Sequence, residues 1–256
     1  MHRWQVVPIS EQQRLDVRPT DLVERGDMRV CNTYRGGGGY DDFPELAQKH
    51  GMVDDPDHAS MQFVVQLRGC NLDCPYCYVT RAGVWGEPVR YTTDELVDAY
   101  RRAVESHGVN VFHLMGGAPA LQLKHWPELL DALGEDTIFH SDLMLSESRY
   151  DDDVLMELDR PNVLLAVSVK GVEPVEWYAN TRKLMDFDLV SYNMRAINEL
   201  LPRERWYLTF TNVTPDNRRE FMARHDVDYH LNIDLIEYDA LPFVDDVPWG
   251  GRDGAL

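Results

Sequence analysis

The sequence predicts an α/β fold, built as a partial barrel of six βα units. Two observations support this prediction. From residue 62 onward, short apolar runs alternate with amphipathic segments, as expected where buried parallel strands are joined by helices. The length of 256 residues also suits one sizeable hydrophobic core. We therefore expect one main domain, which covers residues 61–243.

The strands are predicted from short apolar runs bounded by polar or turn-forming residues. The predicted strands cover residues 63–67, 109–115, 137–141, 163–169, 206–211 and 231–236. Six strands are fewer than the eight of a closed barrel, so we expect a partial TIM-like barrel. In such barrels the loops that follow the strands line one face, and we look for chemistry there.

Helices are predicted between the strands from apolar residues at helical spacing. The first begins at Thr92, where Glu95 three residues later completes a capping box. The helices are predicted near residues 92–104, 126–133, 153–158, 175–185, 192–200 and 218–224.

Both ends of the chain lack such a pattern. In residues 1–60, prolines, the glycine run 36–39 and the acidic stretch 54–57 interrupt every apolar segment. We therefore expect an irregular N-terminal extension over residues 1–60 and a C-terminal tail over residues 244–256.

Charge and hydropathy exclude two classes of partner. The chain has 44 acidic and 25 basic residues, a formal net charge of -19, which would repel a nucleic-acid backbone. The longest apolar run near the middle, 163–167, is far too short to span a bilayer, and the first residues form no hydrophobic signal core. We expect a cytoplasmic protein that binds neither nucleic acid nor membrane.

Three of the four cysteines lie close together after the first predicted strand of the barrel. Cys70, Cys74 and Cys77 follow a Cys-x3-Cys-x2-Cys spacing. Thiolates this close together in an intracellular chain more often share a metal than form disulfides. An iron-sulfur cubane normally takes four cysteines, so three would leave one iron open to another ligand. We predict that the fourth, Cys31, is a small buried core residue.

The segment from Gly69 to Cys77 resembles the signature of the radical S-adenosylmethionine (SAM) superfamily. The resemblance implies that the three cysteines hold a [4Fe-4S] cluster and that SAM binds its open iron through amino and carboxylate groups. It also implies that Tyr76 lies beside the adenine. The implied activity is that of an enzyme with oxidoreductase or lyase-type chemistry, which cleaves SAM reductively to a 5'-deoxyadenosyl radical for hydrogen abstraction.

The second predicted strand of the barrel ends in Gly116, Gly117, Ala118 and Pro119, where the family has Gly-Gly-Glu-Pro. Glycines without a Cβ let the backbone approach a ligand closely. The resemblance implies that this segment binds the amino group of SAM through its backbone. Because alanine replaces the glutamate, the carboxylate that would favour the ammonium is missing at this position.

Two other strand ends carry candidate ligands of SAM. Asp142 is the candidate for the missing carboxylate, and Ser141 beside it for a ligand of the ribose or the carboxylate; a polar turn explains this pair equally well. Ser168 and Lys170 project to the same side of a strand. They resemble the Asp-Leu-Lys motif of glycyl-radical activating enzymes, in which the lysine neutralises the SAM carboxylate, so Lys170 is also a catalytic candidate. A solvated strand end is an equally good explanation.

Three functions remain open from the sequence. The preferred one is a radical SAM enzyme that acts on a small molecule or peptide, because Ala118, Ser168 and Asp239 depart from the activating-enzyme pattern. The alternative within the family is activation of a glycyl-radical protein, since residues 233–241 resemble the last strand of those enzymes. Both imply flavodoxin or ferredoxin as electron donor. The third is a non-enzymatic protein that binds a cluster, or zinc with Cys31 as fourth ligand.

Overall fold

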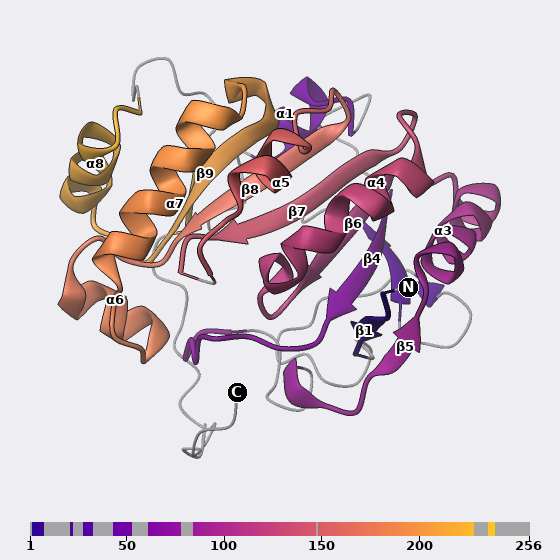
Figure 1. Ribbon diagram of the computed structural model, residues 1–256, viewed down its shortest axis with the longest axis horizontal. Coiled ribbons are helices and arrows are strands. Elements are labelled where there is room, and N and C mark those ends of the chain that lie inside the picture. Colours follow the sequence, from indigo (N-terminus) through magenta and orange to yellow (C-terminus); the bar gives the residue numbers. More distant parts are fainter. Residues whose placement is uncertain are drawn as a thin grey trace.

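The computed structural model describes a central sheet with helices packed on it (Figure 1). It describes residues 2–7, 21–22, 28–32, 43–52, 61–77, 84–146, 148–227 and 235–238.

Six parallel strands form the described centre of the sheet, in the order β10-β9-β8-β7-β6-β4. Each overlaps a strand predicted from the sequence, and within the described residues the sheet is open, so the predicted partial barrel is confirmed. The first part of the last predicted strand, residues 231–234, lies outside the described residues. The bounds are β4 (Met61–Leu67), β6 (Val111–Gly116), β7 (Ile138–Met144), β8 (Val163–Val169), β9 (Trp206–Thr211) and β10 (Leu235–Tyr238).

The helices that connect the strands cover one face of the sheet, where Figure 1 shows α3, α4, α5 and α7 in front of it. The predicted capping box is confirmed: the Thr92 hydroxyl accepts from the Glu95 N–H at 3.1 Å, and the Glu95 carboxylate accepts from the Thr92 N–H at 2.8 Å. None of the described helices has the length and apolar character needed to cross a membrane. The bounds are α3 (Thr93–His107), η1 (Pro119–His125), α4 (Trp126–Leu133), α5 (Asp152–Met156), α6 (Pro174–Thr181), α7 (Phe187–Leu200), η2 (Arg203–Arg205) and α8 (Pro215–Arg224).

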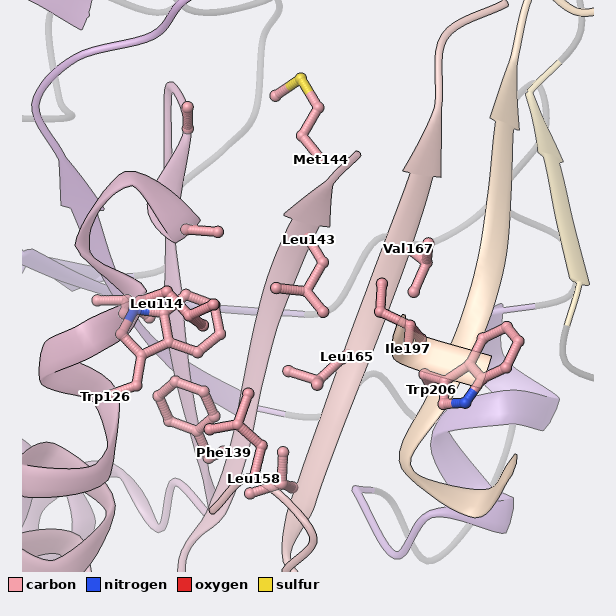
Figure 2. Packing of buried hydrophobic residues seen from close by; sticks show 14 of the residues in the cluster. Leu114, Trp126, Phe139, Leu143, Met144, Leu158, Leu165, Val167, Ile197 and Trp206 are labelled. Atoms are coloured by element: carbon pink, nitrogen blue, oxygen red, sulfur yellow. The ribbon is translucent and has the colours of Figure 1, made fainter. Parts of the chain in front are cut away.

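The main core lies between the sheet and these helices (Figure 2). Alternate residues of the strands, such as Phe139, Leu165 and Val167, meet Trp126 of α4 and Ile197 of α7, and all five are fully buried. Burying each such side chain contributes about 1.5 to 3 kcal/mol. This apolar packing holds the carboxyl ends of the strands in place.

A second, smaller cluster fills the other face of the sheet near the amino ends of the strands. There α1 (Phe43–Lys49) packs Leu46 and Ala47 against Leu164, Ala166 and Tyr207. This face is therefore closed by a helix at one end, and its polar side chains lie towards the other.

The sequence suggested that the N-terminal 60 residues are irregular, but part of this segment forms regular structure. They contribute α1 and three strands, which join the same sheet: β3 pairs antiparallel with β4, and β1 pairs antiparallel with β4 and with β5. β1 and β2 have three and two residues, too few for a periodic pattern to reveal. The bounds are β1 (Trp4–Val6), β2 (Asp21–Leu22), β3 (Met28–Asn32) and β5 (Val89–Tyr91).

Two predictions fall on residues that are not described. Cys31 lies in β3, but its side chain is outside the described part of the chain, so its place in the core stays a prediction. Residues 244–256 are also outside it.

Candidate active site

The loop that carries the three cysteines leaves β4 and runs along the carboxyl ends of the strands towards α6 (Figure 1). Backbone hydrogen bonds hold it at its start and in its middle. The Gly69 N–H donates to the Val84 carbonyl at 2.8 Å, and the Asp73 N–H donates to the Thr181 carbonyl at 2.9 Å. Lys183 adds an ion pair to Asp73 at 2.9 Å. The cysteine loop is thus tied to the end of α6, far away in the sequence.

The three thiols lie in a half-buried position around Tyr76. Burial raises the pKa of the Tyr76 hydroxyl, and nearby Cys74, Cys77 and Cys70 raise it further. Burial also raises the pKa of the Cys74 thiol to about 11, against an opposing attraction from Lys170. A bound metal removes this cost, because it takes the place of the thiol proton.

The three cysteines of the loop are not grouped in the way that a site for one metal ion requires. No three His, Cys, Asp or Glu side chains in the described residues are grouped to hold a single ion. A [4Fe-4S] cluster needs no such grouping, because each cysteine binds a different iron. Three half-buried thiols in one loop at the end of a strand therefore fit a cluster.

The glycines at the end of β6 pack directly against the start of the cysteine loop. A Cβ on Gly117 would lie 2.1 Å from the Gly69 carbonyl oxygen and 2.6 Å from the Cys70 Cβ, and the Ala118 N–H donates to the Gly69 carbonyl at 2.9 Å. Glycine is thus required at this close approach. The side chain of Ala118 is buried in the apolar core, and the buried Pro119 starts η1. The side chains of this segment are thus fixed by packing within the protein, and binding of a ligand by its backbone stays a prediction.

The Lys170 ammonium lies among the cysteine loop, β7 and β9. It is 5.8 Å from the centre of the Tyr76 ring and donates to the Thr211 hydroxyl at 3.2 Å. Its charge opposes the upward pKa shifts of both Cys74 and Asp142. The structure therefore places three predicted site residues around one cation, namely Cys74, Tyr76 and Asp142 around Lys170.

Ser141 and Asp142 lie on opposite faces of β7, because successive residues of a strand alternate. Ser141 is fully buried, and its hydroxyl donates to the Leu114 carbonyl at 2.6 Å, so it holds β6 to β7 and is unsuited to bind a ligand. Asp142 is half-buried on the other face. Burial raises the pKa of its carboxyl to about 6, against an opposing attraction from Lys170. Only Asp142 therefore lies on the same face of the sheet as Ser168 and Lys170.

Ser168 lies on the same face of β8 as Lys170, two residues before it, and accepts a hydrogen bond from the Thr209 hydroxyl at 3.3 Å. Below it, the His140 and Tyr207 side chains are hydrogen-bonded at 2.9 Å, and the ring centres of His140 and His113 are 4.4 Å apart. Burial, reinforced by His113, lowers the pKa of His140 well below its usual range. This face of the sheet therefore presents neutral hydrogen-bonding groups beneath Lys170.

Two residues of this region were missed by sequence reasoning. Thr211, the last residue of β9, contacts the Lys170 ammonium, and the rule that strand ends carry chemistry could have found it. Asn180 of α6 hydrogen-bonds the backbone at the ends of β8 and β9. No sequence signal points to it, because its contacts depend on how α6 packs.

The chain is similar to known proteins in sequence and in structure. A family model described as the radical SAM superfamily matches residues 64–224, more than half of the chain. The match includes the cysteine loop, the glycines of β6 and Lys170. A search of curated proteins found no match.

Several solved structures are similar to this chain at low sequence identity. TYW1 with a lysine-pyruvate adduct is 11% identical, with a TM-score of 0.48 and coverage of 80% of this chain and 74% of that chain. anSMEcpe with bound AdoMet is 17% identical, with a TM-score of 0.47 and coverage of 66% of this chain and 48% of that chain. Streptococcus suis SuiB bound to precursor peptide SuiA is 13% identical, with a TM-score of 0.48 and coverage of 72% of this chain and 40% of that chain. The chain thus spans about half or less of the last two.

Proposed function

The chain belongs to the radical SAM superfamily and is an enzyme of that type, and we propose that Cys70, Cys74 and Cys77 hold a [4Fe-4S] cluster with which it cleaves SAM reductively. One observation carries the proposal: the cysteine loop, the glycine end of β6 and the Lys170 ammonium meet at one edge of the sheet. When bound, the cluster supplies the electron that breaks the C5'–S bond of SAM and yields a 5'-deoxyadenosyl radical.

The protein groups around this edge have distinct proposed roles. Lys170 neutralises the carboxylate of SAM, and Tyr76 lies beside its adenine. The backbone of residues 116–119 accepts from its ammonium. Asp142 supplies the negative charge that Ala118 does not, since it faces Lys170 from the neighbouring strand. Ser168 adds a hydroxyl on the same face.

The substrate is proposed to be a small molecule or peptide. This preference rests on the departures from the glycyl-radical activating-enzyme pattern at Ala118, Ser168 and Asp239. Activation of a glycyl-radical protein stays as the alternative, and a large glycyl-radical protein encoded nearby would favour it. A flavodoxin or ferredoxin is proposed as electron donor.

Anaerobic reconstitution tests this function. We expect about four irons per chain, a brown colour, and an electron paramagnetic resonance signal of the reduced protein that changes when SAM is added. With dithionite and SAM, 5'-deoxyadenosine should accumulate. A colourless protein that carries zinc, or a cluster that does not respond to SAM, would contradict the proposal.

The affinity for SAM is expected to depend on pH through Asp142. Its carboxyl has a pKa of about 6 in the folded protein, and the SAM ammonium favours the ionised form. Affinity should therefore fall roughly fourfold from pH 7.5 to pH 5.5, as measured by equilibrium binding. Because the pKa is raised from 3.8, the protonated carboxyl stabilises the fold without SAM, and this contribution is lost as the pH rises towards 6.

The Asp142→Asn variant is the control for this pH dependence. It should bind SAM more weakly at pH 7.5 and show a flat profile between the two pH values. An unchanged pH profile in the variant would assign the titration to another group.

A further inference from the structure

Asn180 is a buried amide of α6 that has no direct role in the proposed SAM site. It is 2% exposed. Its Nδ2 lies 2.8 Å from the carbonyl oxygen of Lys170, 3.2 Å from that of Thr211 and 3.1 Å from that of Asn212. An amide NH2 has two hydrogens, so three carbonyls share them. One side chain therefore ties the ends of β8 and β9 to α6.

The backbone at both strand ends is shaped to reach this amide. After Lys170 the chain passes so close to α6 that a Cβ on Gly171 would lie 2.5 Å from the Trp177 nitrogen. After Thr211 it turns through Asn212, which has a left-handed φ of 51°, a conformation that asparagine tolerates better than most residues. The carbonyls of two neighbouring strands thereby converge on one donor.

The side chains at the same two strand ends also meet. The Lys170 ammonium donates to the Thr211 hydroxyl at 3.2 Å. The lysine side chain is a flexible stem of four carbons, so the direction of its ammonium depends on how its backbone and its partner are held. If the ends of β8 and β9 moved apart, the ammonium would lose this partner and turn away.

We propose that Asn180 is a positioning residue, which holds the ends of β8 and β9 at the spacing that directs the Lys170 ammonium towards the SAM carboxylate. This inference rests on the proposed function, in which Lys170 binds that carboxylate. The described hydrogen bonds of Asn180 all go to backbone carbonyls, so its effect on ligands passes through Lys170.

Binding of two ligands by the reconstituted protein tests the inference. SAM carries the carboxylate, and decarboxylated SAM lacks it. Asn180→Ala should weaken SAM about tenfold and decarboxylated SAM by less than about twofold. Lys170→Met should also weaken SAM selectively. The double variant should bind SAM no more weakly than Lys170→Met, because both changes remove the same contact.

Asn162 provides a matched control at the opposite, amino-terminal end of β8. Its Nδ2 donates to the carbonyls of Gly134 and Thr137 at 3.1 and 2.7 Å. Asn162→Ala should lower the melting temperature in a similar way and leave the preference for SAM unchanged. If Asn180→Ala does not fold, Asn180→Ser, which keeps one donor, should give a smaller selective loss.

The possible outcomes separate this inference from the proposed function. If Asn180→Ala weakens both ligands equally, or adds to Lys170→Met, Asn180 is a structural residue and the inference is overturned. If Lys170→Met leaves SAM binding unchanged, the proposed role of Lys170 is wrong, whatever Asn180 does.

Discussion

Replacing Cys74 with alanine is expected to abolish cluster binding and the cleavage of SAM. Cys74 is half-buried against the core and lies between the other two proposed ligands in the loop. The set of three cysteines is already one short of the usual four, so losing one more leaves the cluster two ligands. Iron content should fall to background, and 5'-deoxyadenosine formation by more than about 100-fold, because even indirect partners of metal ligands are worth 10- to 100-fold.

Cys31→Ala is the control for this experiment. It should keep the iron, the electron paramagnetic resonance signal and the response to SAM. The pair of variants also tests the zinc alternative, in which Cys31 is the fourth ligand. Loss of bound zinc in both variants would favour that alternative and rule against a cluster on three cysteines.

Gly117→Ala is expected to damage the site through one added carbon. The new Cβ would lie 2.1 Å from the Gly69 oxygen and 2.6 Å from the Cys70 Cβ, so the start of the cysteine loop must shift. Overpacking of this kind costs about 1 to 3 kcal/mol of stability. A displacement of about 1 Å can cost 100-fold in rate, so 5'-deoxyadenosine formation should fall by roughly that factor. Thermal melting and product analysis measure the two effects.

Gly108→Ala is the control, because it separates the effect of a steric clash from the effect of a left-handed backbone. Gly108 ends α3 with a φ of 66°, and a Cβ there would meet nothing within 4 Å. The substitution should cost about 1 to 2 kcal/mol through the left-handed backbone alone and leave SAM cleavage intact. If both glycine variants lost activity in parallel, the close approach at Gly117 would not be the cause.

Much of the fold was predictable because parallel strands buried on both faces appear in the sequence as continuous apolar runs. β8 and β9 have the bounds predicted for them, residues 163–169 and 206–211. The short antiparallel strands β1 and β5 were not predictable. Each has three residues, and each is stabilised by pairing with a distant partner rather than by its own pattern.

The site was predictable where chemistry is local in the sequence. The three cysteines and the glycines of β6 each form a short motif. The end of the strand at Ser141 was predicted wrongly: β7 continues to Met144, so Ser141 and Asp142 alternate between faces. Thr211 and Asn180 act on Lys170 through tertiary packing, which single-sequence patterns do not contain.

The site is assembled from segments that a ribosome makes at different times. The cysteine loop is hydrogen-bonded to Thr181, and Lys170 is hydrogen-bonded to Thr211. The loop is therefore synthesised before these partners. At about 5 to 20 residues per second, the stretch from Cys77 to Thr211 takes roughly 7 to 27 s. During this interval the three thiols have no finished barrel around them. The thiols and the groups around Lys170 can therefore form one site only after Thr211 has been made.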